Sequence, residues 1–352
     1  MISWLSADNR AGIDAAVDAA LARIRRRATD GAEAYAALTA AVTRAATGGK
    51  RFRPANVVGA YLAFDGPDEA LTTVYEVAAA FELLHAAFVV HDDVIDHDVQ
   101  RRGVLNISGE FRTRAAAAGA SASGADDLGD AAAILGGDLL LYEATRILAL
   151  VDVPAATRAA LVELFDDAVS VSAAGELADV ENALGLHAAE AAAVLTTAHD
   201  KTAVYSFDAP LRAGALLAGA SEPELEALRR AGGALGLAFQ LVDDLIGAFG
   251  TADQAGRDAG SDLREAKRTP LVVLAQQGAG RDAVAEALAV AHTGPVAVLA
   301  AQRALDATGA RERLAVLIDE TLRSARADAA TLSPAALGLV DELATRIAER
   351  MP

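Results

Sequence analysis

Hydrophobic and polar positions alternate with helical spacing along almost the whole chain. Apolar residues recur every three or four positions, and good helix formers fill the positions between them. Prolines are few and fall mainly where such segments begin or break, and no run of alternating β-branched residues predicts a strand. The clearest predicted helices cover residues 11–28, 69–97, 156–182, 187–220, 223–249 and 312–328. The pattern predicts one all-α domain over residues 1–352.

Two segments interrupt this pattern. Residues 115–127, AAAAGASASGADD, have low complexity, which predicts a mobile surface loop. Residues 250–270 are rich in glycine and in charge, which predicts a loop that becomes ordered when a ligand binds.

Composition narrows the function. The net charge of -18 argues against nucleic acid as a partner, because nucleic-acid binding needs a basic surface. The chain has no cysteine, which excludes disulfides and thiolate metal sites and is typical of a reducing compartment. Its first residues lack the pattern of a signal peptide, and no apolar run reaches the roughly 18 residues that a membrane span requires. We therefore expect a cytoplasmic protein without a transmembrane segment.

Two clusters of aspartates stand within apolar segments. Asp92, Asp93 and Asp96 follow one apolar run, and Asp243 and Asp244 interrupt another far along the chain. A solvated helix end explains one such cluster as well as a functional site does, but it explains two less easily. Carboxylates this close repel one another unless a positive charge lies among them. If the two helices face each other, their oxygens suit Mg²⁺, so we expect a metal ion to supply that charge.

Basic residues gather in four short segments. Taken singly, each is more often an ordinary surface charge. Taken with two acidic clusters, they predict a site for Mg²⁺-bound diphosphate, because guanidinium and ammonium groups pair with phosphate oxygens. No phosphate-binding loop of the Walker type is present, and the histidines lack zinc-type spacing. The segments hold Lys50, Arg51 and Arg53; Arg101 and Arg102; Lys201 beside Thr202; and Arg264, Lys267 and Arg268.

The motifs together resemble the trans-type isoprenyl diphosphate synthases, or polyprenyl synthetases, over about residues 45–275. GGKRFRP, ELLHAAFVVHDDVID, RRG, GGDLLL, KTA, FQLVDDLIG and GSDLREAKRTP occur in the order typical of that family. The resemblance implies an all-α bundle of antiparallel helices around a deep central cavity (the isoprenoid synthase type I fold), usually as a homodimer. It also implies head-to-tail condensation of isopentenyl diphosphate with an allylic diphosphate (dimethylallyl, geranyl or farnesyl), with release of pyrophosphate.

The resemblance assigns roles to individual residues. It implies Mg²⁺ as cofactor, with about three ions per site when substrate is bound. Positions that match the metal ligands are Asp92, Asp96 and Asp243, with Asp93 and Asp244 supporting them. Positions that match the isopentenyl diphosphate site are Lys50, Arg53, His85 and Arg102, and those that match the allylic diphosphate site are Arg101, Lys201, Thr202, Gln240 and Lys267. Lys201 is also a candidate helper, with Thr202 or Gln240, in transferring the proton to the released pyrophosphate.

Three positions depart from the family pattern. Gly247 stands where many members have a third aspartate, so metal binding by the second cluster depends on Asp243 and Asp244. Arg257, a further candidate for substrate binding, stands where a lysine is common, and Leu105 replaces a common proline. None of these changes removes a group that the chemistry needs.

The helix before the first cluster carries candidate determinants of product length. Phe81, His85, Phe88, Asp92 and Asp96 are spaced as one stripe, which places Phe88 one turn, or roughly 5 Å, from Asp92. In the family, the residues four and five before the first aspartate commonly form the floor that stops elongation. Here these are Phe88 and Ala87, one bulky and one small, which favours geranylgeranyl diphosphate (C20) over farnesyl diphosphate (C15).

Two other functions are alternatives to a synthase. A terpene cyclase of the same fold normally carries Asn, Ser or Thr, and Glu on the later helix, where this chain has DDLIG. A non-catalytic partner subunit typically loses carboxylates of the first cluster, which this chain retains. Both alternatives are therefore less favoured than a synthase.

Overall fold

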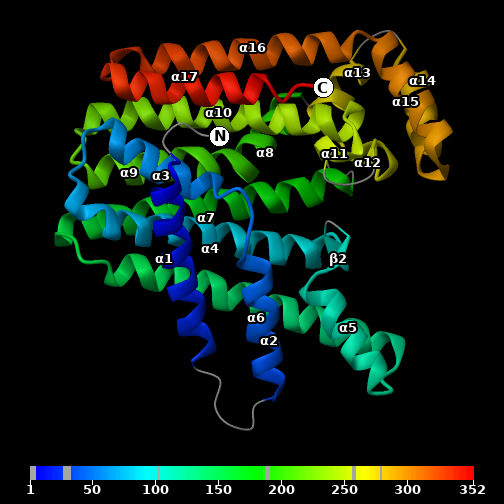
Figure 1. The fold of residues 1–352 in the computed structure, drawn as a ribbon. Coiled ribbons are helices and arrows are strands. Elements are labelled where there is room, and N and C mark those ends of the chain that lie inside the picture. Colours follow the sequence, from blue (N-terminus) through cyan, green and yellow to red (C-terminus); the bar gives the residue numbers. More distant parts are fainter. Residues whose placement is uncertain are drawn as a thin grey trace. The chain divides into compact units, whose positions relative to one another are not determined.

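The computed structural model describes residues 5–26, 33–101, 103–184, 186, 191–255, 259–277 and 280–352. Almost all of this described chain is helical, as Figure 1 shows. Contacts divide the chain into two compact units, Met1–Phe165 with Ala213–Gly219, and Asp166–Arg212 with Ala220–Pro352. Two boundaries fall inside helices α7 (Ala155–Ala183) and α9 (Ala209–Leu217), and the third lies in the turn after α9. That the whole chain forms a single domain stays a prediction.

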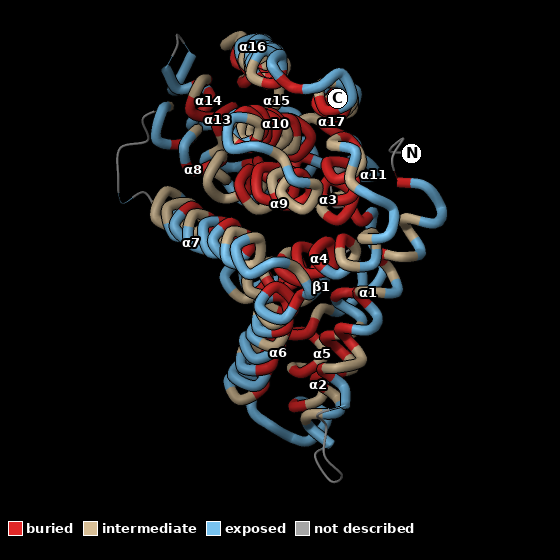
Figure 2. The backbone as a smooth tube through the Cα atoms, turned by 90° about the vertical axis from the view of Figure 1, so that its left-hand side faces the viewer, coloured by how far each residue is buried: buried red, intermediate tan, exposed pale blue. Residues whose placement is uncertain are grey.

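The first unit is built on helix α4, most of whose apolar window is buried. Its core includes Phe81, which is fully buried and meets Phe165 edge to face at 6.0 Å. Figure 2 shows the buried positions, in red, along α3 and α4. The elements of this unit are α1 (Ala7–Arg25), α2 (Glu33–Ala46), α3 (Phe52–Ala63), η1 (Asp68–Ala70), α4 (Leu71–Ile95), β1 (Gln100–Arg101), β2 (Val104–Leu105), α5 (Ile107–Ala117) and α6 (Ala122–Leu150), with the first part of α7 and the last part of α9.

The second unit is built on helix α10. This helix begins at a capping box, in which the Ser221 backbone N–H donates to the Glu224 carboxylate at 2.8 Å, and Pro223 occupies its first turn. It packs against α8, α16 and α17. The elements are α8 (Ala191–Ala203), the π-helical turn η2 (Val204–Asp208), α10 (Glu222–Phe249), α11 (Ala252–Ala255), α12 (Ser261–Arg264), α13 (Pro270–Gln276), α14 (Arg281–Val290), η3 (Ala291–Thr293), α15 (Pro295–Ala307), α16 (Ala310–Asp328), η4 (Ala329–Thr331) and α17 (Pro334–Ala348).

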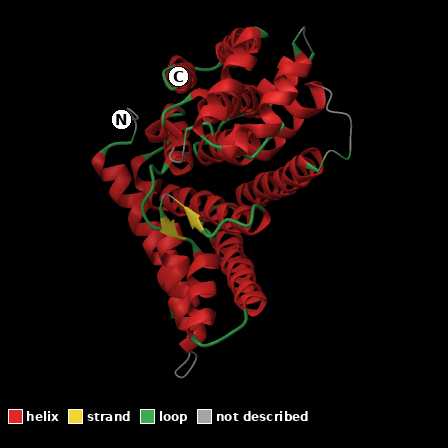
Figure 3. Cartoon of the chain, turned by 90° about the vertical axis from the view of Figure 1, so that its right-hand side faces the viewer, coloured by secondary structure: helices red, strands yellow, loops and turns green. Residues whose placement is uncertain are grey.

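Several sequence-based expectations about local structure need correction. The expected loop at residues 115–127 is wrong for most of its length, because α5 continues to Ala117 and α6 begins at Ala122. Ser121 caps α6 by accepting from the Gly124 N–H at 3.1 Å, and alanine is the best helix former. The predicted helix over 187–220 is interrupted by the π-helical turn η2, and its first part, 187–190, lies outside the described residues. A short antiparallel hairpin, yellow in Figure 3, pairs Gln100 with Leu105 where no strand was expected.

The charged segment 250–270 contains two short helices. They are α11 and α12, and residues 256–258 between them lie outside the described part of the chain. That this segment becomes ordered on ligand binding stays a prediction.

Two helical stretches, Asp68–Ile95 and Glu222–Phe249, pass a length and hydropathy test for membrane spans, although the sequence pattern led us to expect none. In each, 67% of the most apolar window is buried inside the protein. Core helices of folded proteins meet the same test, and this burial is what such helices show. A cytoplasmic location stays a prediction.

Candidate active site

The first acidic cluster lies at the carboxyl end of α4. Asp92 and Asp93 stand in its last turn and Asp96 is the C-cap residue. Asp93 is buried, with 6% of its side chain exposed, whereas Asp92 is 28% exposed and Asp96 is exposed. The cluster therefore presents the carboxylates of Asp92 and Asp96 to solvent and turns that of Asp93 inward.

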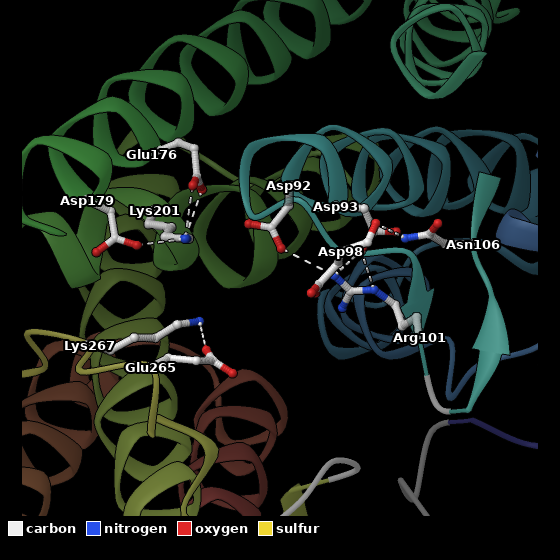
Figure 4. Close-up of polar contacts among 10 residues, drawn as sticks. All are labelled: Asp92, Asp93, Asp98, Arg101, Asn106, Glu176, Asp179, Lys201, Glu265 and Lys267. Atoms are coloured by element: carbon white, nitrogen blue, oxygen red, sulfur yellow. Dashed lines mark hydrogen bonds and ion pairs between the residues drawn. The ribbon is translucent and has the colours of Figure 1, made fainter. Parts of the chain in front are cut away.

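Arg101 on strand β1 supplies a fixed positive charge to this cluster. Its guanidinium donates to Asp93 Oδ1 from Nε at 2.9 Å and from Nη2 at 2.7 Å, and Nη2 also donates to Asp92 Oδ2 at 3.3 Å (Figure 4). Burial raises the pKa of Asp93, and the charge and hydrogen bonds of Arg101 oppose that rise. Arg101 therefore supplies positive charge to Asp93, and the expected metal ion among these carboxylates stays a prediction.

The hairpin and the start of α5 hold Arg101 in place. The side chain of Asn106 caps α5 by accepting from the Gly109 N–H at 2.9 Å, and it donates to the Asp98 carbonyl at 2.8 Å. Asn106 also hydrogen-bonds the Asp93 carboxylate, as Figure 4 shows. Arg102, the candidate next to Arg101, lies outside the described residues.

The basic segment before α3 divides into outward and inward cations. Lys50 is exposed and Arg53 is half-buried, but Arg51 is buried. Arg51 donates to Asp14 from Nε at 2.8 Å and to Glu82 from Nη1 at 2.9 Å. Its backbone lies in the left-handed region, with φ of 51°, which turns this side chain inward and ends the preceding loop. Arg51 is therefore a structural cation, and Lys50 and Arg53 remain the candidates for diphosphate.

The stripe expected along α4 lies on one uninterrupted helix. Phe81 and Ala87 are fully buried, whereas His85 and Phe88 are half-buried. A half-buried ring one turn before Asp92 is compatible with a wall beside the acidic cluster. The roles of His85 in binding and of Ala87 and Phe88 in setting product length stay predictions.

In the second unit, Lys201 on α8 is held by two carboxylates of α7. Its Nζ donates to Glu176 Oε1 at 3.1 Å and to Asp179 Oδ2 at 2.8 Å (Figure 4). The two helices approach closely at Gly175, where a Cβ atom would lie 2.4 Å from the backbone nitrogen of Lys201. Glycine at this position therefore brings the ammonium group within reach of both carboxylates.

A hydrogen-bonded chain connects α8 to the second acidic cluster. Thr202 Oγ1 donates to Gln240 Oε1 at 2.8 Å, and Gln240 Nε2 donates to Asp244 Oδ1 at 2.9 Å. These three residues, each a candidate in the sequence, thus act as one polar unit. Because both donors are neutral, the chain orients the Asp244 carboxylate without neutralising it.

The two aspartates of this cluster differ in their surroundings. Asp244 is 6% exposed, and burial, together with the negative charge of Asp262, raises its pKa well above the usual range. Its second oxygen, Oδ2, has no hydrogen-bond partner among the described residues. Asp243 is part-exposed and pairs with Arg350, whose guanidinium lies 4.3 Å from the centre of the Phe239 ring.

The remaining candidates lie in the segment after α10. Lys267 Nζ lies 3.2 Å from Glu265 Oε2, and both side chains are partly exposed (Figure 4). Arg257 lies outside the described residues.

The carboxylates have the donor chemistry that Mg²⁺ needs. Mg²⁺ takes oxygen ligands and usually keeps several waters, with one or two carboxylates and substrate phosphates completing its shell. Within the described ranges, no three acidic or histidine side chains are close enough to hold an ion by themselves. In the first unit, the solvent-accessible carboxylates of Asp92 and Asp96 fit an ion that arrives with a phosphate-bearing ligand. In the second unit, Asp244 Oδ2, which has no hydrogen-bond partner among the described residues, has the same donor chemistry.

Sequence reasoning missed several partners of the candidate residues. Glu176 and Asp179 are three apart on α7, a spacing that places them on one helix face, so this signal was available. The pairing of Arg350 with Asp243 spans 107 residues, and no local pattern indicates it. The two acidic clusters belong to different units, so their convergence on one ion stays a prediction.

Comparisons with known proteins all find prenyl diphosphate synthases. A sequence model described as polyprenyl synthetase matches residues 35–305. The geranylgeranyl diphosphate synthase of Sulfolobus acidocaldarius is 31% identical over 229 residues, which are 64% of this chain and 63% of that relative. The nonaprenyl diphosphate synthase of Mycobacterium tuberculosis is also 31% identical, over 67% of this chain and 62% of its own length. This chain thus spans less than two thirds of the length of either relative.

Solved structures extend the likeness to nearly the full chain. A geranylgeranyl pyrophosphate synthase from Corynebacterium glutamicum, complexed with isoprenyl diphosphate and magnesium, has a TM-score of 0.85 at 29% identity and covers 97% of both chains. A polyprenyl synthase from Caulobacter crescentus, complexed with calcium and isoprenyl diphosphate, has a TM-score of 0.74 at 28% identity, over 99% of this chain and 98% of its own. The expected all-α fold is confirmed.

Proposed function

This chain belongs to the polyprenyl synthetase family, and we propose that it is a Mg²⁺-dependent prenyltransferase. It condenses isopentenyl diphosphate head-to-tail with an allylic diphosphate and releases pyrophosphate. The observation that carries the proposal is the family match over residues 35–305, because this range contains both acidic clusters and every basic candidate from Lys50 to Lys267. The solved relative that holds isoprenyl diphosphate and magnesium supports the same substrate class and ion.

The reaction breaks the bond between C1 of the allylic chain and its diphosphate oxygen. The electron pair leaves with the diphosphate, and the double bond of isopentenyl diphosphate attacks the resulting cation to form the new carbon–carbon bond. A proton is then lost from the isopentenyl unit and passes to the released pyrophosphate. Charge therefore develops on the leaving diphosphate, and groups fixed around it lower the barrier.

In this proposal, three aspartates bind the metal ion and Arg101 positions the carboxylates of the first cluster. Asp92, Asp96 and Asp243 would hold Mg²⁺, which supplies positive charge to the leaving diphosphate. Arg101 neutralises the buried Asp93 and orients Asp92 beside it. This pairing supports a positioning role for Arg101, in place of the sequence-based role in binding the allylic diphosphate.

The basic side chains bind the diphosphates in this proposal. Lys201 and Lys267 are partly exposed and pair with carboxylates, so each can exchange a carboxylate for a phosphate oxygen. Lys50 and Arg53 take the diphosphate of the isopentenyl substrate. Thr202 and Gln240 hold the Asp244 carboxylate in a fixed orientation while the leaving group departs.

We further propose a short product, with C20 preferred. The half-buried ring of Phe88, next to the small buried Ala87, supports a partial floor below Asp92. Curated relatives of similar identity include geranylgeranyl, octaprenyl and nonaprenyl diphosphate synthases, so the relatives alone allow longer products. Product length therefore needs its own test, separate from the test of the reaction class.

A homodimer is the proposed assembly. Leu128, Leu135 and Tyr142 are spaced seven apart on α6, so they lie along one face, and they are 41%, 55% and 56% exposed. Exposed large apolar side chains in one line favour burial against another protein surface. Leu135→Asp should shift the mass measured by light scattering from dimer to monomer, and a wild-type protein that is already monomeric would contradict the assembly.

The reaction is tested with purified protein, Mg²⁺, labelled isopentenyl diphosphate and each allylic primer. We expect prenyl diphosphates and pyrophosphate, with turnover abolished by EDTA and restored by Mg²⁺. Asp92→Ala and Asp243→Ala should lower the rate by several orders of magnitude while the circular dichroism stays helical. Asp319→Ala, which removes a carboxylate 67% exposed on α16, is the matched control and should keep the rate.

Three results separate the alternatives. A hydrocarbon product formed without isopentenyl diphosphate would indicate a terpene cyclase. Turnover that requires a second, different subunit would indicate a partner role. Near-normal activity in Asp92→Ala would overturn the metal-binding role of the first cluster.

A further inference from the structure

Gly247 on α10 has no room for a side chain because the carboxylate of Asp262 occupies the space. A Cβ atom at position 247 would lie 1.8 Å from Asp262 Oδ2 and 2.5 Å from its Cγ. Real Cβ atoms do not approach other atoms this closely, so any other residue at 247 must displace Asp262. Gly247 is four residues after Asp243 and three after Asp244, on the same side of the helix. At this turn, α10 is therefore in contact with the carboxylate of Asp262, which comes from another segment.

The backbone of α12 holds Asp262 against this turn. Asp262 is 5% exposed, and its carbonyl accepts from the Lys267 N–H at 2.9 Å. The helix begins after Gly260, whose φ of 69° allows the chain to turn into α12. Asp262 is therefore set by main-chain structure as well as by its own contacts.

A second observation indicates that this acidic turn is built for a positive ligand. Asp244 Oδ2 lies in a residue more than nine-tenths buried, and it has no hydrogen-bond partner among the described residues. Asp262 meets α10 at Gly247, three residues after Asp244, so a further negative charge lies at the same turn of the helix. Buried carboxylates that face one another cost free energy unless a cation or a proton donor reaches them.

We propose that Asp262 supplies the carboxylate that position 247 lacks and completes the second acidic cluster with Asp243 and Asp244. Since Mg²⁺ keeps several of its waters, Asp262 acts on the waters of a bound ion and is a positioning residue. The inference rests on the proposed function, because that function brings Mg²⁺ to this cluster. The competing explanation is that Asp262 only fixes the loop, in which case its removal changes stability but not metal affinity.

The test measures metal binding directly, without turnover. Mn²⁺ binding in the presence of inorganic pyrophosphate is followed by electron paramagnetic resonance in wild type, Asp262→Asn and Gly247→Ala. Loss of a residue that orients metal-bound groups typically weakens metal binding by about 10- to 100-fold, so we expect a loss of this size in both variants. Gly247→Ala loses affinity because its methyl group displaces the Asp262 carboxylate.

Two controls match these changes. Gly233→Ala adds the same methyl group on α10, where it meets only the His199 ring at 3.1 Å. Asp253→Asn removes an exposed carboxylate of the same chain segment. Both controls should bind Mn²⁺ within about twofold of wild type, which is below the weakest loss expected for Asp262.

The decisive variant exchanges the two positions. Gly247→Asp alone should lose affinity through the clash, whereas Gly247→Asp combined with Asp262→Gly should recover most of the wild-type affinity. Unchanged Mn²⁺ affinity in Asp262→Asn, or no recovery in the exchanged variant, overturns the inference.

If the variants do not fold, metal-directed cleavage of the wild-type backbone tests the inference. Fe²⁺ bound in place of Mg²⁺, with ascorbate and peroxide, cleaves the backbone close to the ion. Fragments ending near residues 243–247 and near 262 support the inference, and cleavage near 243–247 without any near 262 overturns it. Condensation activity is measured in parallel, so an inactive wild type that still binds Mn²⁺ refutes the proposed function and not the role of Asp262.

Discussion

Asp208 makes the stability of this protein depend on pH in a direction that the structure determines. It ends the π-helical turn η2 and is 7% exposed. Burial raises its pKa from 3.8 to about 6, although Arg212, whose Nη1 lies 3.5 Å from Oδ1, and the charges of Arg229 and His199 oppose the rise. The folded protein therefore binds the proton of Asp208 more tightly than the unfolded chain does.

The sign and size of the effect follow from this difference. Well below pH 3.8 the carboxyl is protonated in both states and its stabilising contribution is complete. As the pH rises towards 6, only the folded state holds the proton, so the free energy of unfolding falls. Each pKa unit corresponds to about 1.4 kcal/mol, so the rise from 3.8 to about 6 amounts to about 3 kcal/mol at pH 7 and above.

Asp208→Asn removes this titration and keeps the shape of the side chain. We expect it to increase the free energy of unfolding at pH 8 by up to about 3 kcal/mol and to change it little at pH 4. The gain is an upper limit, because asparagine accepts a weaker hydrogen bond from Arg212 than an ionised carboxylate does.

Urea unfolding followed by circular dichroism, from pH 4 to pH 8, measures the effect. Asp319→Asn on α16, whose carboxylate is 67% exposed and pairs with Arg323, is the control and should change stability by less than about 0.5 kcal/mol at each pH. An Asp208→Asn difference that is constant across pH, or a loss of stability at pH 8, would refute the reasoning.

Three further predictions concern the site. Lys50→Ala should mainly raise KM for isopentenyl diphosphate and Lys267→Ala that for the allylic substrate, each by about ten- to a hundredfold for a contact worth roughly 1.5–3 kcal/mol; equal effects on both substrates would contradict the division. Phe88→Ala should lengthen the product beyond C20 with little loss of the first condensation, and an unchanged chromatogram of dephosphorylated products would place the floor elsewhere. Arg350→Ala should strengthen Mn²⁺ binding in the presence of pyrophosphate, because Arg350 competes for Asp243; weaker binding would show instead that Arg350 orients that carboxylate.

Much of the fold could be predicted from the sequence because helices depend on neighbours within one turn. The apolar spacing along α4 and α10 predicted both long helices, and their ends lie within a few residues of the predicted ranges. The expected loop at 115–127 is wrong for a local reason too, because alanine has a high helix propensity and Ser121 caps α6.

The candidate site was only partly predictable. The sequence indicated which aspartates and cations carry the chemistry, because paired acids in apolar helices and repeated basic segments are unusual. It did not indicate which cations form ion pairs within the protein instead of binding substrate. Arg51 pairs with Asp14 and Glu82, and Arg101 pairs with Asp93. These contacts form only in the folded chain.

The amino-acid sequence alone was enough to predict most of the helices, the two acidic clusters and the residue types available for binding diphosphate. The partners of these residues became known from the folded chain: the α7 carboxylates that pair with Lys201, the guanidinium that pairs with Asp243, and the Asp262 carboxylate beside Gly247. The cause is the separation along the sequence over which each kind of interaction acts. Periodicity and capping act between residues a few positions apart, whereas each of these contacts joins separate segments, and its geometry depends on how closely two helices pack.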